Sequence, residues 1–321
     1  MGQELRDIGE HALIGLLSQR MQQNSQVVVG VGDDAAVVRI GSEDIVLCTD
    51  AMVEGVHFMR EWSTPAQLGG KIVARNLADI AAMGALPTGF TLSLTAPATT
   101  DVDWVLALVD GVNAECARAG IAFLGGDTTA GDGVVLVGSG LGEMRGMSPL
   151  LRSGAQPGDV LAVHGHLGCA AAGLMQLKRG DEAGACVEAQ LLPQPDYSAA
   201  RAAATAATSM IDTSDGLVID AGHIAKSSSV DIDISRADTP VLSCVRAVAA
   251  ECGVDVWHWV LGGGEDHAFL ATFPDETSVP PGFTVIGRVS PGDGQVTIDG
   301  QAWTHSPGFE HFASGDPRLL G

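Results

Sequence analysis

Basic residues are scarce in this sequence, which has 17 Lys and Arg against 39 Asp and Glu and a formal net charge of -22. Proteins that bind nucleic acids generally present a basic face to the phosphate backbone, so this composition argues against that class. A small anionic substrate stays compatible with the charge, but it then requires metal ions and a few well-placed cations. We therefore expect no nucleic-acid partner.

Long apolar runs and paired cysteines are also missing. No stretch reaches the ~18 residues of a membrane span, and the first residues lack the basic region and apolar core of a secretory signal. No CxxC pair occurs, which argues against a zinc motif or a disulfide framework. We expect a cytoplasmic protein without a membrane contact and with free thiols. The cysteines are Cys48, Cys116, Cys169, Cys186, Cys244 and Cys252.

Three familiar catalytic motifs are absent as well. The sequence has no GxxxxGKS/T loop, which excludes a P-loop kinase, and no HExxH or GxSxG motif. The turn at 30–35 fits GxGxxA after an apolar run, which is similar to a dinucleotide-binding turn. Its adjacent carboxylates, Asp33 and Asp34, would repel a pyrophosphate, so a metal-binding turn is the better interpretation.

Carboxylates repeatedly follow apolar, strand-like runs. Because strand ends converge on one edge of a sheet, we expect these acids to converge too. Several carboxylates in one place repel each other unless cations hold them. The pattern predicts a site for several hard divalent ions, which most often serve phosphate chemistry. The acids concerned are Asp33, Asp34, Asp50, Asp127, Asp212 and Asp215.

The helix expected at 68–83 has a charged face. Lys71, Arg75 and Asp79 follow one another at intervals of four, while the remaining positions are strongly apolar. An intrahelical ion pair is one interpretation. A buried charged face that needs a partner from elsewhere is the other, and it favours a site.

Hydrophobic periodicity predicts an α/β (α+β) fold in two domains, for which 321 residues are sufficient. The segment 144–159 is rich in Gly, Pro and Ser, so we place the boundary there, with domains at 1–147 and 148–321. Expected helices lie at 4–23, 68–83, 101–119, 167–179, 196–208, 216–226 and 241–252. Expected strands lie at 27–31, 35–40, 45–49, 89–95, 121–125, 134–142, 159–163, 209–212, 230–234, 267–273, 283–289 and 295–299.

Two further segments suggest anion or metal contacts. Asp212-Thr213-Ser214-Asp215-Gly216 leads into a helix, where Ser214 or Asp215 is a natural N-cap and free N–H groups suit a phosphate. Gly262-Gly263-Gly264-Glu265-Asp266 is a glycine-rich turn with two acids. Arg152 lies in what we expect to be an exposed linker, able to reach a nucleotide phosphate.

Taken together, these segments resemble the thiamine-monophosphate kinase family, within the aminoimidazole-ribonucleotide synthetase superfamily of ATP-binding proteins. The similarity runs in the family's order from about residue 4 to residue 312. The matching segments are Gly32-Asp33-Asp34-Ala35, Thr49-Asp50, Glu54-Gly55-Val56-His57-Phe58, Arg75-Asn76-Leu77-Ala78-Asp79, Gly125-Gly126-Asp127-Thr128-Thr129, Arg152-Ser153-Gly154-Ala155, Asp212-Thr213-Ser214-Asp215-Gly216 and Gly263-Gly264-Glu265-Asp266.

The resemblance implies magnesium-dependent transfer of the γ-phosphoryl of ATP to thiamine monophosphate. It implies a homodimer that pairs its N-terminal sheets, and a C-terminal α+β sandwich. No general base is implied, because the acceptor phosphate is already ionised and catalysis rests on alignment and charge neutralisation. The implied metal ligands are Asp33, Cys48, Thr49, Asp50, Asp79, Asp127, Asp212 and Asp215. Gly126, Asp127, Arg152 and Ser214 match ATP-binding positions, and His57, Glu265 and Phe309 match substrate-binding positions.

The chain departs from the family pattern in two places. Cys48 stands where many relatives have Ser or Thr, and the usual Glu-Asp-Tyr-Glu-Leu is Glu265-Asp266-His267-Ala268-Phe269 here. Three other functions stay open as alternatives. They are aminoimidazole-ribonucleotide synthetase, a two-metal phosphohydrolase with no need of ATP, and a non-catalytic metal- or nucleotide-binding protein.

Overall fold

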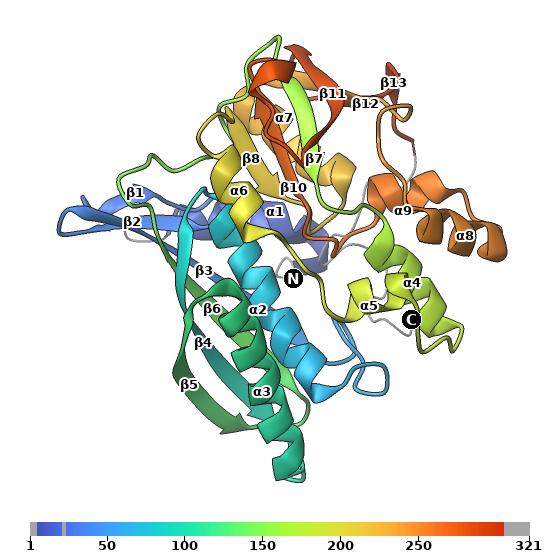
Figure 1. Cartoon of the computed structure of the whole chain (residues 1–321). Helices are drawn as coiled ribbons and strands as arrows, with labels where there is room; N and C mark the ends of the chain where they lie inside the picture. Colours follow the sequence, from blue (N-terminus) through green and yellow to red (C-terminus); the bar gives the residue numbers. More distant parts are fainter. Residues whose placement is uncertain (1–4, 21–23, 305–321) are drawn as a thin grey trace.

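The computed structural model describes residues 5–20 and 24–304. These residues form two β-sheets with helices packed against them, which confirms the predicted mixed α/β fold (Figure 1). The first half contributes a six-stranded sheet of order β1-β2-β3-β6-β4-β5. The second half contributes a seven-stranded sheet of order β13-β12-β9-β11-β7-β10-β8. Among the described residues, no helix combines the length and apolar character that a membrane crossing requires.

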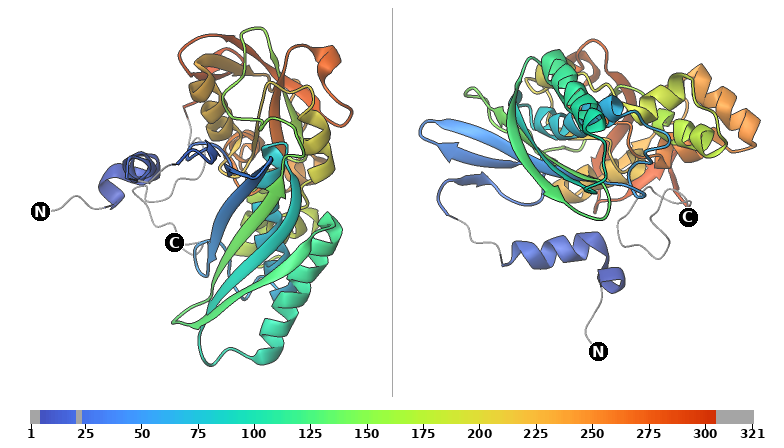
Figure 2. Two further views of the ribbon diagram at one scale, coloured as in Figure 1. Left: turned by 90° about the vertical axis from the view of Figure 1, so that its left-hand side faces the viewer. Right: turned by 90° about the horizontal axis from the view of Figure 1, so that it is seen from below.

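The first sheet is antiparallel except for the parallel pair β4 and β5, which α3 connects. Helices α2 and α3 cover one of its faces, and α1 stands apart from the rest of the chain (Figure 2). The strands are β1 (Val27–Val29), β2 (Ala36–Ile40), β3 (Glu43–Val53), β4 (Leu86–Ala96), β5 (Ala122–Ala130) and β6 (Val135–Glu143). The helices are α1 (Leu5–Ser18), α2 (Pro65–Ala82) and α3 (Val102–Ala119).

The second sheet is antiparallel except where β12 pairs with β9. Its strands are β7 (Val160–His164), β8 (Ser209–Asp212), β9 (Val230–Ile234), β10 (Phe269–Phe273), β11 (Thr284–Pro291), β12 (Val296–Ile298) and β13 (Gln301–Ala302). Its helices are α4 (Cys169–Lys178), α5 (Ala185–Leu191), α6 (Tyr197–Ala203), α7 (Leu217–Ser228), α8 (Ser243–Cys252), α9 (Val256–Gly262) and the short η1 (Glu276–Ser278). Helices α5 and α9 were not predicted, whereas the equally short α6 was expected as part of a longer helix at 196–208.

Helix α2 lies between the two sheets. It begins with a capping box, in which Thr64 accepts from the Gln67 amide and the Gln67 side chain accepts from the Thr64 amide. Its first turns bury apolar side chains such as Ile72 in the core of the first sheet. Its last turns pack Ala78 and its neighbours against Phe269 of the second sheet. The same helix therefore completes two hydrophobic cores.

Glycines allow α2 and α3 to approach closely. A Cβ atom at Gly111 would lie 1.9 Å from the carbonyl oxygen of Ala66, and one at Gly69 would lie 2.0 Å from that of Leu108. A side chain at either position would force the helices apart. This contact fixes α2 against the sheet and so fixes the direction of its charged face.

Two of the acids do not end strands, so that part of the prediction is wrong. Strand β3 continues through Asp50 to Val53, and β5 continues through Asp127 to Ala130. Small and hydroxyl-bearing residues beside these acids suggest a turn, but they also fit the pleated surface of a sheet. Asp33 and Asp212 do follow strands as predicted: Asp33 lies in the turn after β1, and Asp212 is the last residue of β8.

Candidate active site

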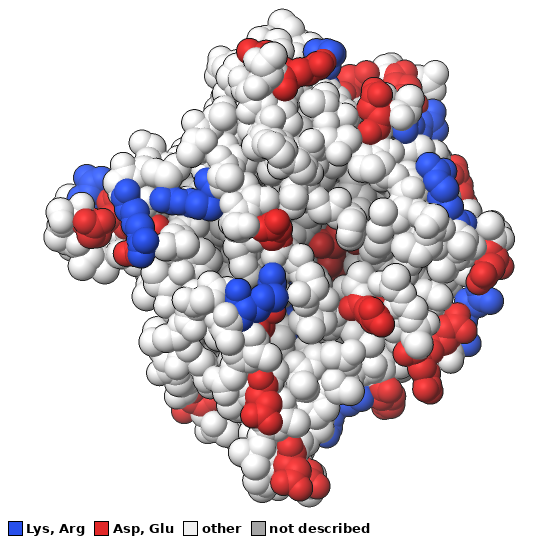
Figure 3. Space-filling model, viewed as in Figure 1, with Lys and Arg blue, Asp and Glu red and all other residues white. Residues whose placement is uncertain are grey.

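A cavity of about 690 Å³ lies where the two halves of the chain meet, and most of the predicted site residues line it. From the first half come Asp33, Cys48, Thr49, Asp50, His57 and Asp79, and from the second come Arg152, Ser214, Asp215 and Glu265. The cavity therefore unites motifs that are far apart in the sequence. On the face shown in Figure 3, basic side chains lie singly or in small groups among acidic ones, without a broad basic patch.

Carboxylates at this cavity repel one another. Burial, and then the charges of Asp50, Asp212 and Asp34, raise the pKa of Asp79 well above its usual range. Burial, with a further contribution from Asp212, raises the pKa of Asp34 to about 7 against the opposing effect of Arg152. Divalent cations stabilise a group of carboxylates whose negative charges otherwise repel one another. The residues present therefore fit hard cations with oxygen ligands.

Asp34 holds the second half of the chain against the first. Its carboxylate accepts from Nε of Arg152 at 2.7 Å and lies 2.6 Å from Nη2 of the same guanidinium group. It also accepts from the Asp212 amide at 3.3 Å. The Arg152 amide donates to Asp33 at 2.7 Å. The expectation of an exposed linker at Arg152 is wrong, because its side chain is only 24% exposed and is held at the cavity wall.

The charged face of α2 meets a partner from the second half of the chain. Lys71 lies 2.9 Å from the Glu265 carboxylate and donates to the Gln190 carbonyl at 2.8 Å. Arg75 forms an ion pair with the same carboxylate, and its Nε lies 3.6 Å from Asp50. Burial alone would raise the pKa of Glu265, but Arg75 and Lys71 outweigh it and hold that pKa below its usual range. The second interpretation of this face, a buried set of charges with an outside partner, is confirmed.

The loop that presents Glu265 is conformationally strained. Both Glu265 (φ 69°) and His267 (φ 50°) have left-handed backbone conformations, which residues other than glycine rarely adopt. Such strain persists only where surrounding contacts determine it, and it occurs often at functional sites. Here the contacts of Glu265 with Lys71 and Arg75 supply that constraint.

Cys48 and Thr49 point to opposite faces of β3, as adjacent residues of a strand must. The Cys48 thiol is buried and donates to the Asn76 carbonyl at 3.1 Å, and burial raises its pKa well above the usual range. The Thr49 hydroxyl lies 2.9 Å from that of Ser139 on the outer face of the sheet. Both side chains therefore already have hydrogen-bond partners.

The structure does not bring every predicted residue to this cavity. Asp50, Gly138, Leu92 and Gly126 are register partners across β3, β6, β4 and β5. Three strand spacings of ~4.8 Å place Gly126 about 14 Å from β3, and Asp127 follows it on the exposed edge strand. His57 lines the cavity and accepts from the Val53 amide at 3.0 Å. Phe309 lies outside the described residues.

His267, which the sequence identified only as a departure from the family pattern, contacts one of the predicted site residues. Its Nδ1 lies 2.8 Å from the Asp212 carboxylate, and its ring is almost fully buried. Asp212 is therefore oriented by a histidine from the strained loop. No local pattern could predict this pair, because it joins the end of β8 to a loop 55 residues later.

The expected N-cap of α7 is also corrected. Gly216, not Ser214 or Asp215, occupies the N-cap position, and the buried Asp220 accepts from its amide at 3.0 Å. Ser214 and Asp215 consequently lie before the helix at the cavity wall. Asp266 lines a different cavity from the other predicted acids and accepts from the Gly168 and Ala170 amides at the start of α4. Burial raises the pKa of Asp266 to about 7.

Comparison with known proteins assigns a family to this arrangement. The family model for the AIR synthase related protein, N-terminal domain, matches residues 32–144. Thiamine-monophosphate kinase of Mycobacterium tuberculosis is 43% identical over 315 residues, which are 97% of this chain and 94% of the relative. Thiamine-monophosphate kinase of Corynebacterium glutamicum is 36% identical over 326 residues, covering 97% of this chain and 96% of the relative.

Solved structures agree with the sequence relatives. AaThiL complexed with AMPPCP and TMP superposes with a TM-score of 0.89 at 30% identity, covering 97% of this chain and 99% of that one. The similarity therefore extends over both sheets and the cavity between them. This chain belongs to the thiamine-monophosphate kinase family.

Proposed function

We propose that this protein transfers the γ-phosphoryl group of ATP to thiamine monophosphate, giving ADP and thiamine diphosphate. The observation that supports this most is the cavity in which acids from both sheets meet Arg152 and the Lys71–Arg75–Glu265 group. Full-length identity of 43% to a kinase of this name, and similarity to a structure complexed with AMPPCP and TMP, support the same reaction.

The donor set suits magnesium. The carboxylates that would hold it are Asp33, Asp50, Asp79 and Asp215, which line the cavity, with backbone oxygens of Cys48 and Thr49. Asp212 would join them, although it is buried and does not itself line the cavity. When bound, divalent ions neutralise phosphate charge and align the two phosphates. Among these residues, Asp212 is held in orientation by His267, so its position does not depend on solvent.

The remaining groups position the two substrates. In this proposal, Arg152, which Asp34 contacts, and Ser214 would bind the ATP phosphates, while His57 and Glu265 would bind thiamine monophosphate; all four line the cavity. Glu265 stays ionised between Lys71 and Arg75, so it is a fixed acceptor at the cavity wall. No side chain has to remove a proton, because the acceptor phosphate is already ionised. Alignment and charge neutralisation then provide the rate enhancement.

We also infer that the protein is a homodimer. The outer face of the first sheet carries exposed apolar side chains. Leu47 is 40% exposed and Leu124 is 58% exposed. Gly126 and Asp127, on β5, are too far from the cavity of their own chain to serve it. In a dimer that pairs these sheets, they would serve the cavity of the second copy. Mixing inactive Asp127→Asn and Asp212→Asn chains should then restore activity, whereas mixtures that stay inactive would contradict this arrangement.

The test of the reaction is ADP release that depends on thiamine monophosphate. Asp212→Asn should abolish it while far-ultraviolet circular dichroism stays unchanged. Asp181→Asn, on an exposed loop away from the cavity, should keep full activity. Near-normal turnover of Asp212→Asn would contradict the proposal that this residue binds a metal ion. Release of phosphate from thiamine monophosphate without ATP would instead indicate a two-metal phosphohydrolase.

A further inference from the structure

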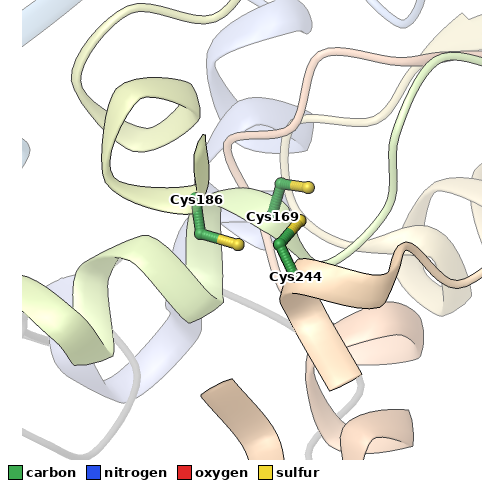
Figure 4. A group of neighbouring side chains, drawn as sticks. All are labelled: Cys169, Cys186 and Cys244. Carbon is green, nitrogen blue, oxygen red and sulfur yellow. The ribbon is translucent and has the colours of Figure 1, made fainter. Parts of the chain in front are cut away.

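Three of the six cysteines gather at one point, although they share no sequence motif. Cys169 begins α4, Cys186 is on α5 and Cys244 is on α8, and their sulfur atoms all lie within 4.8 Å of one another. Figure 4 shows the three side chains converging from the three helices. Cys169 and Cys186 are buried, and Cys244 is partly buried. We call these residues the cysteine cluster.

The packing of α4 against α5 brings the backbones that carry Cys169 and Cys186 close together. Gly173 lies one turn after Cys169 on the same face of α4. A Cβ atom at Gly173 would lie 2.0 Å from the carbonyl oxygen of Cys186. The absence of a side chain therefore lets the α5 backbone approach α4 at the level of the cysteine cluster. The cluster is held by main-chain packing and not by flexible side chains alone.

The thiols interact with each other. Hydrogen bonding from Cys169, with a smaller contribution from Cys244, lowers the pKa of Cys186 to about 7 in spite of burial. The same hydrogen bond, and then burial, raise the pKa of Cys169. A thiolate is thus accessible in the cluster near neutral pH, and the thiolate is the form that binds metals. Among the described residues, no imidazole or carboxylate joins this group, so its donors are sulfur alone.

We propose that Cys169, Cys186 and Cys244 bind one thiophilic metal ion of the d10 class, Cu⁺ or Zn²⁺, through their three sulfur atoms. Soft thiolate ligands select these ions, whereas magnesium prefers the oxygen ligands of the active-site cavity. Binding releases the thiol protons to solvent. Three sulfurs suffice for Cu⁺. Zn²⁺ takes a fourth ligand, usually water, and Cys169 lines a second cavity of about 720 Å³ through which water can reach it.

The cysteine cluster also adjoins the active-site wall. Ala170 and Leu174 of α4 line the active-site cavity, and the Gln190 carbonyl of α5 accepts from Lys71. An ion bound to all three cysteines would therefore connect α4, α5 and α8 and restrict the motion of these helices behind Lys71 and Glu265. Metal binding is measured without the proposed kinase reaction. A failure of the metal-site proposal can therefore be distinguished from a failure of the proposed function.

The test uses the full-length, reduced and metal-free protein in excess Mg²⁺. Equilibrium dialysis against Zn²⁺, and against Cu⁺ without oxygen, should give one ion per chain for at least one of them. Cd²⁺ used as a spectroscopic probe should produce a thiolate-to-metal charge-transfer band, and proton release should accompany binding. Reduced wild-type protein that binds none of these ions would overturn the proposal without the need for any variant.

Cysteine variants then locate the site. Cys186→Ser and Cys244→Ser should weaken binding by more than the ~10–100-fold that loss of an outer partner costs. Cys252→Ser is the matched control, because Cys252 is on α8 with Cys244 but contacts Arg179 outside the cluster. It should bind normally. Because Cys244 is only partly buried, its serine variant should keep the fold, which circular dichroism checks. Unchanged binding by both cluster variants would place the ion elsewhere.

Discussion

Arg75 forms an ion pair with Glu265 across 190 residues of sequence, and Lys71 reaches the same carboxylate at 2.9 Å. One carboxylate thus pairs with two cations on the buried face of α2. The pair of cations explains why Glu265 is held in a left-handed conformation, and it links the two halves of the active-site wall. Removing the carboxylate should affect both stability and substrate binding.

Glu265→Gln should lower the free energy of unfolding by about 2–3 kcal/mol. The reason is that the buried cations Lys71 and Arg75 lose the carboxylate that they share. The loss is smaller than for an entirely buried ion pair, because Glu265 is partly exposed. Urea unfolding measures this change. Glu276→Gln, which breaks an exposed pair with Arg288, should leave unfolding unchanged. Equal effects of the two substitutions would show that the Glu265 group does not stabilise the fold.

Asp79→Asn should stabilise the metal-free protein and abolish ADP release. Burial and neighbouring carboxylates raise the pKa of Asp79, so its ionised form costs stability at neutral pH. Removing that charge should raise Tm by a few degrees, roughly what ~1 kcal/mol produces in a chain of this size. Thermal unfolding without and with Mg²⁺ checks this. The wild type should gain more from Mg²⁺ than the variant, and a lower Tm of the metal-free variant would contradict the repulsion argument.

Tyr197 should ionise only as the protein unfolds at alkaline pH. Burial, and then the charge of Glu115, raise its pKa well above the usual range, and its hydroxyl donates to Glu115 at 2.6 Å. Because the folded pKa is raised, this stabilisation is complete below about pH 10 and is lost as the pH rises further. The chain has one tyrosine, so tyrosinate absorbance reports this residue alone.

The control for this titration is Tyr197→Phe. It should lose about 1 kcal/mol at neutral pH, from the missing hydrogen bond, and should show a smaller decline of stability above pH 10. If tyrosinate formed near pH 10 while circular dichroism still showed a folded chain, the burial of this hydroxyl would be refuted.

Gly111→Ala should destabilise the protein by at least about 2 kcal/mol, because the new methyl group overlaps the Ala66 carbonyl on α2. Alanine is otherwise the better helix former, so the sign of the change distinguishes packing from propensity. Gly133→Ala is the matched control, since a Cβ atom there meets nothing within 4 Å. Chemical unfolding of the two variants compares them. A stable Gly111→Ala variant would mean that α2 and α3 can separate without cost.

Local sequence patterns predicted the elements of this fold well, and they predicted its long-range contacts poorly. The α3 helix and the β8 strand were expected almost at their observed bounds, because periodicity and stop signals act within one element. Asp50 and Asp127 were misplaced at strand ends, since small and hydroxyl-bearing residues look alike in a turn and on a sheet face. The Glu265 partner of Lys71 and the cysteine cluster depend on how separate elements pack, which no spacing encodes.

Helix α2 has a consequence for how the protein unfolds. Because its last turns complete a core with Phe269, the second half of the chain cannot keep that apolar surface covered without the first half. Separating the two halves would expose Phe269 and the alanine face of α2 at the same time. Both sheets should therefore melt in a single cooperative transition, and a protease should cleave within the two sheets only when both unfold.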